Sequence, residues 1–503
     1  MFSAQVHRRI YLVLLALLGA CMVTSVWASN LVWVLLGANW LLEGRWREKW
    51  QMARDSRLLQ AIVVSYLLCV IGLLWTSNMG HGLSVLQVKM PLLFLPLVLL
   101  TTRPVEGKAR RNILWLYCAT VTVVSVIGLV RVLTIPELPY RDAIPYISHI
   151  RFALNCCMVI YLCVAAAMRG HSPWRLLYLL PALWMLVFVV VVLHSYTAVA
   201  VLAGVSLVIL LVRYRRWPLI ALWVLLAGAF ALLLCREVKA YYHMVPMAQE
   251  PLRPYTEAGN PYYHMQDGLI ENGNYINNYL CSEEMREQWS RRSKVPYHGL
   301  TSTGYSVEPT LVRYLNALGL TKDSVGVSKL TDAQIVDIEH GIANPVYTNG
   351  NPLKKMVYVM LLEREFYIHT HAVSGFTMIQ RFELWDATLD VIAHNLWFGT
   401  GTGDVGDELH KVLTQRKSDL ASTSKMSHNQ YLSFLAALGV VGFVLVIALL
   451  LRAAPRMRRQ SAVMLAWLLT ILISCLTEDT LGTLAGILFC TYFLAFRDDE
   501  SAS

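Results

Sequence analysis

The stretch Leu58–Trp75, LLQAIVVSYLLCVIGLLW, decides the fold class because it runs for a whole helix length without a charged residue. About 20 apolar residues in a helix cross the ~30 Å hydrocarbon core of a bilayer. The basic segment EGRWREKWQMARDSR (43–57) precedes this stretch, and the short turn SNMGH (77–81) follows it. The stretch therefore predicts a transmembrane helix whose basic flank lies on one side of the membrane.

The same pattern recurs along most of the chain. Of its 503 residues, 56% are apolar and 15% are charged, whereas an ordinary soluble domain has about 25% charged residues. The apolar residues come in blocks rather than alternating as in a membrane β-barrel. This composition excludes a soluble enzyme and a disordered chain, and it predicts an all-α polytopic membrane protein. About twelve spans are expected, within a range of eleven to thirteen, at 10–27, 29–43, 58–76, 83–101, 113–132, 150–168, 176–193, 195–212, 218–235, 429–451, 461–477 and 480–496.

Basic residues are distributed so that they orient these spans. Lys and Arg number 43 against 33 acidic residues, for a net charge of +10, but the excess forms no patch suited to nucleic acid. It lies in every second short loop, while the loops between carry only Arg141. Positive loops stay in the cytoplasm, so both termini are predicted to be cytoplasmic, with the N-terminal run as an uncleaved first span. The basic loops are EGRWREKWQMARDSR, RPVEGKARR, RGHSPWR, RYRRW and RAAPRMRR.

The polar residues divide the chain into three predicted parts. Residues 1–235 hold the first nine spans, and residues 429–503 hold the last three with a short cytoplasmic tail. Between them, residues 236–428 are continuously polar and face outward by the predicted topology. A segment of this length is too long for a connector, so we expect a mainly helical outer domain.

Helix signals within this outer segment are clear. Thr331-Asp332-Ala333-Gln334 is a capping box, and Gly341 is expected to end the helix that it begins. A second helix is predicted over 353–368 and a third over 375–394. The third is expected to carry one apolar face, made of Phe382, Trp385, Leu389 and Ile392.

His428 is the most informative candidate for chemistry. It stands in Ser427-His-Asn-Gln-Tyr-Leu432, where the outer segment enters the tenth span. An imidazole titrates near neutrality and can take a proton from a sugar hydroxyl, and a lipid-anchored substrate presents its headgroup at this depth. The alternative is an interfacial histidine that only caps the helix.

A second candidate is Arg381, one helical turn before Trp385. Arginine is preferred for bidentate phosphate contacts; the alternative is a solvated arginine paired with Glu383 or Asp386. The run Gly399-Thr-Gly401-Thr-Gly403 that follows is interpreted as a tight turn. It is not a nucleotide loop, because no strand precedes it and no βαβ unit surrounds it.

Three further charged residues are predicted near the outer ends of spans. Arg151 could supply a second cation for a diphosphate, or could only anchor its helix at the interface. Lys89 and Glu478 are weaker candidates of the same kind. His369 and His371 have no carboxylate partner in register, so no metal site is predicted.

Taken in order, these motifs resemble the bacterial O-antigen ligase and polymerase superfamily. The resemblance rests on the His428-Asn429-x-Tyr-Leu motif with its two following glycines, on Arg381…Trp385 with the glycine run, and on one long outer loop before that motif. The loop is most similar to Bacteroidetes-type members, through NGNYINNYL, REQWSRRS, LVRYLNALGLTKDS, LTDAQIVDIEHGIAN and LTEDTLGTLAG.

The resemblance implies a membrane-embedded glycosyltransferase with a GT-C-like helical fold in the bacterial inner membrane, acting at its periplasmic face without metal or cofactor. The donor would be a glycan on undecaprenyl diphosphate. The acceptor would be a sugar hydroxyl on lipid A–core in a ligase, or another lipid-linked glycan in a polymerase. His428 would be the base and Arg381 would hold the diphosphate, with Arg151 supporting; Lys89, Glu478, Asn429 and Trp385 are supporting candidates.

The chain departs from the family pattern at one place. Many members carry Ser-Arg-Gly at the outer start of a span where this chain reads His194-Ser195-Tyr196-Thr197, so Tyr196 replaces the expected arginine. Arg151 or Lys89 would then supply that cation. A transporter of the lipid-linked glycan is a third hypothesis. A transporter would be expected to carry charged residues near the membrane midplane, whereas the charged residues of this chain cluster at the outer edge of its spans.

Overall fold

The computed structural model describes residues 3–136, 138–169, 173–243, 251–266, 268–370, 373, 377–423 and 426–498. The chain forms two compact units. Unit 1 comprises Met1–Ile220, Leu384–Lys417 and Ala421–Ser503, and unit 2 comprises Ala221–Glu383 and Ser418–Leu420. The predicted boundaries at residues 235 and 428 concern the membrane rather than packing, and they stay predictions.

Every apolar segment predicted as a span lies on helix, which confirms an all-α polytopic membrane protein. Within the described residues, nine helical segments are long and apolar enough to cross a membrane. Helix α2 (Val26–Glu43) is not among them, and α20 (Ala462–Ser474) and α21 with η8 (Leu484–Tyr492, Phe493–Phe496) are shorter. The count of twelve spans stays a prediction. The nine are α1 (Ala4–Thr24), α4 with η1 (Arg57–Ile71, Gly72–Trp75), α5 (Met79–Leu100), α6 (Gly107–Thr134), α7 (His149–Arg169), η3 with α8 and η4 (Pro173–Tyr178, Leu179–Val187, Phe188–Val192), α9 with η5 (Tyr196–Ile209, Leu210–Tyr214), α10 (Trp217–Tyr242) and α19 (Gln430–Arg459).

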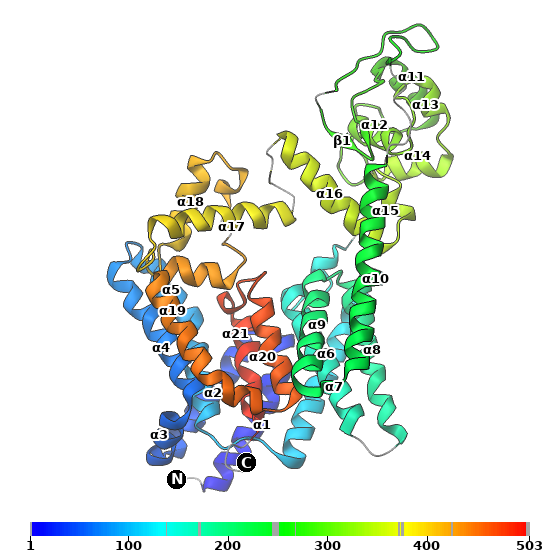
Figure 1. Ribbon diagram of the computed structural model, residues 1–503. Coiled ribbons are helices and arrows are strands. Elements are labelled where there is room, and N and C mark those ends of the chain that lie inside the picture. The colour runs from blue at the N-terminus through cyan, green and yellow to red at the C-terminus, as the bar shows by residue number, and fades with distance from the viewer. Residues whose placement is uncertain are drawn as a thin grey trace. The chain divides into compact units, whose positions relative to one another are not determined.

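The helices of unit 1 pack into one bundle. Helix α1 packs on α2 and α6, α19 packs on α4, and α20 packs on α7 and α9. Short helix α3 (Trp46–Asp55) lies at one end of unit 1, while α18 (Val405–Gln415) and the start of α5 lie at the other (Figure 1). We call these the α3 end and the α18 end. The 3-10 turns η2 (Tyr140–Asp142), η6 (Asp419–Ser422) and η7 (Thr480–Gly482) complete the described helical segments.

Basic loops predicted to be cytoplasmic meet at the α3 end. Arg456 Nη1 donates to the Asp55 carbonyl over 2.6 Å, and Arg8 Nη2 donates to the Pro104 carbonyl over 2.7 Å. These contacts gather the loops after α2, α5 and α19 on one side of unit 1. Such clustering is what the predicted orientation requires, although the side of the membrane stays a prediction.

Helix α19 is broken at Gly439, whose φ of +64° and ψ of −178° leave the helical region. A break frees backbone groups that hydrocarbon cannot hydrogen-bond. Here the loop after α17 supplies partners: the Thr400 N–H donates to the Ala436 carbonyl over 2.9 Å, and the Gly401 N–H donates to the Ala437 carbonyl over 3.1 Å. The break is therefore built into the fold and stabilised by a second segment.

Beyond the break, the same loop accepts hydrogen bonds as well. The Val440 N–H donates to the Leu396 carbonyl over 2.8 Å, and the Val441 N–H donates to the Trp397 carbonyl over 3.2 Å. Four hydrogen bonds thus join α19 to the loop, two running in each direction. They hold the first turns of α19, and the residues just before them, against the end of α17.

The glycine run forms the tight turn that the sequence predicts, because backbone approaches backbone there. A Cβ at Gly399, where φ is +72°, would lie 2.5 Å from the Ala437 carbonyl oxygen. Asp404 then fastens the turn to the segment between η1 and α5: its carboxylate accepts the Ser77 N–H over 2.6 Å and the Asn78 N–H over 2.7 Å.

Unit 2 carries a two-stranded hairpin on a helical framework. Strands β1 (Ile270–Glu271) and β2 (Asn274–Tyr275) pair antiparallel across Asn272-Gly273, both with positive φ, as an Asn-Gly hairpin turn requires. Trp289, Met285 and Tyr314 are buried in the main core. The helices are α10 from Ala221 onward, α11 (Ser282–Arg292), α12 (Val307–Ala317), α13 (Ser324–Ser328), α14 (Asp332–Glu339), α15 (Val346–Asn349), α16 (Pro352–Thr370) and the start of α17 (Thr377–His394).

The three helices predicted in the polar segment are confirmed. Thr331 and Gln334 form the reciprocal capping box that begins α14, and Gly341 follows that helix with φ +80°. Helices α16 and α17 coincide with the other two, apart from residues 375–376, which lie outside the described residues. The predicted apolar face of α17 is buried only in part: Ile392 lies in the core, but Leu389 is 50% exposed, and unit 1 also buries Leu384, Ala387 and Val391.

Replacing Gly439 by alanine should destabilise unit 1, because a non-glycine residue in this backbone region costs about 1–3 kcal/mol and its Cβ would meet the Trp397 carbonyl. We expect a clear fall in the unfolding temperature of the detergent-solubilised protein. Gly37→Ala in α2 is the matched control, since no atom lies within 4 Å of its added Cβ. Equal unfolding temperatures for the two variants would contradict the assigned role of the break.

Candidate active site

His428 lies at the α18 end of unit 1, immediately before α19. Its φ is +51°, and its backbone N–H donates to Asp479 Oδ2 over 3.0 Å. The N-cap of α19 is Asn429, whose side-chain oxygen accepts the Tyr431 N–H over 3.0 Å and the Leu432 N–H over 3.2 Å. Capping is therefore done by Asn429, and the His428 imidazole is not needed for it.

The turn between α20 and α21 holds this segment in place. The second carboxylate oxygen of Asp479 accepts the Ser433 hydroxyl over 2.7 Å. This one side chain therefore binds both His428, just before α19, and Ser433, in its first turn. The Gln430 N–H donates to the Cys475 carbonyl over 2.9 Å, and Gln430 Oε1 accepts the Leu481 N–H over 2.7 Å. Backbone and side-chain hydrogen bonds from the α20–α21 turn thus fix position 428.

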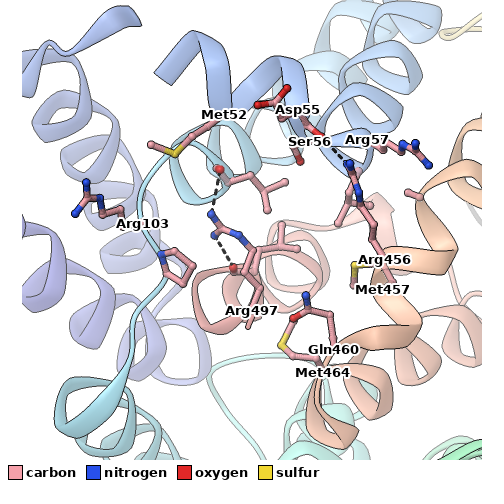
Figure 2. A pocket seen from close by; sticks show the side chains of 15 residues that line it. Met52, Asp55, Ser56, Arg57, Arg103, Arg456, Met457, Gln460, Met464 and Arg497 are labelled. Atoms are coloured by element: carbon pink, nitrogen blue, oxygen red, sulfur yellow. Dashed lines mark hydrogen bonds between the residues drawn. The ribbon is translucent and has the colours of Figure 1, made fainter. Parts of the chain in front are cut away.

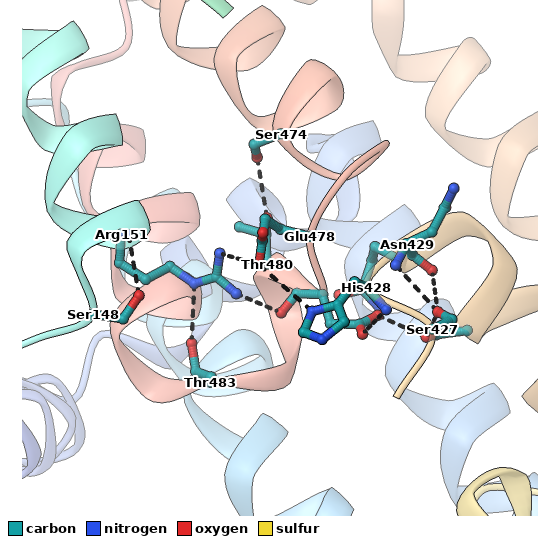
Figure 3. Close-up of polar contacts among 12 residues, drawn as sticks. Ser148, Arg151, Ser427, His428, Asn429, Ser474, Glu478, Thr480 and Thr483 are labelled. Carbon is teal, nitrogen blue, oxygen red and sulfur yellow. Dashed lines mark hydrogen bonds and ion pairs between the residues drawn. The ribbon is translucent and has the colours of Figure 1, made fainter. Parts of the chain in front are cut away.

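Arg151, in the first turn of α7, reaches the same turn (Figure 3). Its Nη2 donates to the Asp479 carbonyl over 2.9 Å, and its Nε donates to Thr483 Oγ1 over 3.4 Å. Its Nη1 lies 3.7 Å from Glu478 Oε2 and makes no hydrogen bond to the described residues. Arg151 therefore holds the α20–α21 turn through Nη2 and Nε, whereas its Nη1 donates no hydrogen bond to the described residues.

Glu478 lies between the two basic side chains. Its Oε2 is 3.7 Å from Arg151 Nη1 and 4.0 Å from His428 Nδ1. The side chains of Arg151 and Glu478 are 8% and 6% exposed, whereas that of His428 is 38% exposed. Of these three groups, His428 alone is accessible to a substrate. A carboxylate at this distance can stabilise the imidazolium that forms when a histidine takes up a proton.

The other predicted residues are distributed as follows. Lys89 on α5 lies with its Nζ 5.4 Å from the centre of the Phe434 ring on α19, which brings it to the first turns of the same helix. Trp385 lies on the part of α17 that belongs to unit 1, and Arg381 belongs to unit 2. The structure thus brings Arg151, Glu478, His428 and Asn429 together, and Arg381 stays a predicted partner of that group.

Three contributors to this cluster escape sequence reasoning. Asp479 accepts the His428 N–H, Ser433 donates its hydroxyl to Asp479, and the Thr483 hydroxyl oxygen accepts from Arg151. Asp479 stands beside the predicted Glu478 in LTEDTLGTLAG, and two adjacent carboxylates in an apolar region were the available signal. Within the described residues, no group of three or more His, Cys, Asp or Glu is placed to hold a metal ion; His371 lies outside them.

Arg151→Met or Glu478→Gln alone should lower the unfolding temperature strongly, because removing one partner of a buried ion pair costs about 3–5 kcal/mol. The double variant should lose less than the two single losses combined, since neither charge is then left alone. Arg291→Met, which breaks an exposed pair with Glu287, is the control and should change little. Additive losses in the double variant would show that the two side chains are not coupled.

Part of the chain is similar to a known protein family. Residues 352–447 match a family model described as O-antigen ligase, and no curated protein matches the chain. The matched segment is about a fifth of the chain. It begins at the first residue of α16 and ends within α19 beyond the break at Gly439, so it includes Arg381, Trp385, the glycine turn and His428. Residues 352–447 are therefore similar to the O-antigen ligase family, which confirms the resemblance of this membrane protein to the O-antigen ligase and polymerase superfamily.

Proposed function

We propose that this chain is an O-antigen ligase-type glycosyltransferase that moves a glycan from undecaprenyl diphosphate to a sugar hydroxyl of lipid A–core at the periplasmic face of the inner membrane. The observation that carries the proposal is the accessible His428 imidazole, within the segment similar to the O-antigen ligase family, beside the buried Glu478–Arg151 pair. A GT-C-like arrangement and cytoplasmic termini belong to the same proposal.

The proposed reaction is a displacement at the anomeric carbon of the donor. The acceptor oxygen forms the new glycosidic bond, and the bond from the anomeric carbon to the diphosphate oxygen breaks with its electron pair leaving on the diphosphate. His428 takes the proton of the acceptor hydroxyl, and Glu478, 4.0 Å from Nδ1, stabilises the imidazolium. Base assistance of this kind contributes about 10²–10⁴-fold to the rate.

The leaving diphosphate requires cations, since negative charge develops on it in the transition state. We assign Arg381 as its ligand and Arg151 as a supporting cation, whose buried guanidinium acts through its charge rather than by direct contact. Support for Arg151 comes from its position, because its Nη1 lies 3.7 Å from the Glu478 carboxylate, which in turn lies 4.0 Å from His428 Nδ1. Lys89 is a third source of positive charge, held near the start of α19 by Phe434.

A polymerase that joins lipid-linked repeat units is the second candidate. The match to the O-antigen ligase family supports the superfamily that contains both activities, and the cluster around His428 suits either acceptor. The two differ in the product that accumulates when the chain is absent. A deletion strain with bare core and long polymer on its lipid carrier would identify a ligase, whereas core bearing one repeat unit would identify a polymerase.

His428→Ala should reproduce the surface glycolipid ladder of the deletion strain, because no other accessible base stands in the Arg151–Glu478–His428 group. The variant should keep the wild-type unfolding temperature, since Asn429 caps α19 and the backbone N–H of residue 428 still reaches Asp479.

His81→Ala is the matched control, as His81 is exposed near the same end of unit 1. It should leave the ladder unchanged. A wild-type ladder from the His428→Ala strain would exclude His428 as the base.

Arg381→Lys should also impair transfer strongly, because a point charge replaces a planar fork that binds two phosphate oxygens at once. We expect a loss of at least tenfold in the amount of glycosylated core at equal protein level. Arg291→Lys, an exposed residue of α11 in unit 2, should have no effect. Normal transfer by Arg381→Lys would remove Arg381 from the diphosphate site.

A further inference from the structure

A cavity of about 600 Å³ opens at the α3 end of unit 1. Figure 2 shows it between the end of α3, the start of α4, the loop after α5, the last turns of α19 and the segment after η8. These segments are far apart in the sequence, and all belong to unit 1. The cavity lies at the opposite end of unit 1 from His428, so it is separate from the proposed transfer site.

Four arginines from four segments line this cavity: Arg57, Arg103, Arg456 and Arg497. Asp55 is the only carboxylate among the lining residues, so the lining carries a net positive charge. Backbone oxygens accept hydrogen bonds from Arg456 and Arg497 in this lining. Arg497 donates to the Leu99 carbonyl over 2.8 Å and Arg456 to that of Asp55 over 2.6 Å.

The rest of the lining is largely apolar. Leu58, Leu100, Leu494, Met457 and Met464 face the same space as the guanidinium groups. A small hydrophilic anion would leave these side chains without a partner. A molecule with an anionic head and hydrocarbon chains would satisfy both parts of the lining, because apolar surface gains from contact with hydrocarbon.

Orientation of the spans does not by itself account for this arrangement. The positive-inside effect needs basic residues in short loops, and exposed arginines such as Arg47 and Arg54 serve it equally well. It does not require arginines from four separate segments to line one cavity between helices. Basic pockets of that kind, at the level of the headgroups, bind anionic lipids.

We propose that this cavity binds the headgroup of an anionic phospholipid. The phosphate would lie among the four arginines, and the acyl chains would pass along the leucine and methionine side chains toward the hydrocarbon. Because the last turns of α19 line the cavity and the first turn of α19 follows His428, the bound lipid would hold one end of the helix whose other end carries the proposed base.

The test is a titration of the full-length protein in neutral detergent with phosphatidylglycerol, phosphatidylcholine or inorganic pyrophosphate, with bound molecules counted by native mass spectrometry. Wild type should bind its first phosphatidylglycerol more tightly than either alternative. Arg57→Gln/Arg103→Gln should weaken that binding roughly 30-fold, as expected for two basic residues at a membrane surface. Arg57→Lys/Arg103→Lys should retain most of it.

Arg47→Gln/Arg54→Gln removes the same charge from the same end without touching the cavity lining, and it should bind like wild type. Equal weakening by this control would show that only the overall charge of the α3 end matters, and would overturn the proposal. Pyrophosphate binding to wild type as tight as that of phosphatidylglycerol would overturn it as well, and it would assign the cavity to a soluble anion. This second comparison needs no variant.

Discussion

The fold of unit 1 depends on the rule that hydrocarbon offers no hydrogen bonds to a broken helix. Helix α19 breaks at Gly439 in an apolar stretch, and every backbone group freed there has to find a partner in the protein. The loop at 396–401 supplies these partners in both directions. Gly399 is needed in this loop because a side chain there would separate the loop backbone from that of α19. Asp404 extends the connection to the start of α5.

This constraint bears on function because α19 begins directly after His428. A helix held rigidly at its break and at its N-cap presents position 428 in one place. The α20–α21 turn adds the second support through two adjacent carboxylates with separate roles. Asp479 binds the backbone and the Ser433 hydroxyl, whereas Glu478 faces the imidazole and the Arg151 guanidinium. Geometry and charge are thus supplied by neighbouring residues of one short turn.

Sequence reasoning predicted the parts that depend on local pattern. Apolar length identifies the helices, and the capping box at Thr331 identifies α14 to within a residue. Sequence reasoning was less successful where packing decides burial: of the apolar face predicted for α17, Ile392 is buried, but Leu389 is 50% exposed. Leu384, Ala387 and Val391, outside that face, are buried as well. The sequence motifs also point to Arg151, Glu478 and His428, but only as separate residues. Arg151 and Glu478 are 327 positions apart in the chain, and only the packing of the helices brings their side chains within 3.7 Å.

The break in α19 could not be predicted from the glycines alone, since Gly439 and Gly442 read equally well as small residues within a continuous span. Only Gly439 has a left-handed φ, and the reason lies in the approach of residues 396–401, which is a tertiary contact. Asp479 was missed for a similar cause. The adjacent carboxylates Glu478 and Asp479 in an apolar region mark the turn. The partners of Asp479 are a backbone N–H and a hydroxyl from a distant helix start, and that tertiary contact cannot be inferred from the sequence.

The most direct test of the account is a reconstituted reaction. Liposomes would contain this chain as the only protein, a glycan on undecaprenyl diphosphate and lipid A–core, and both glycosylated core and released undecaprenyl diphosphate would be measured. The account predicts equal amounts of the two products from wild type and neither from a folded His428→Ala variant. Absence of both products with wild type, or equal transfer by the variant, would contradict it.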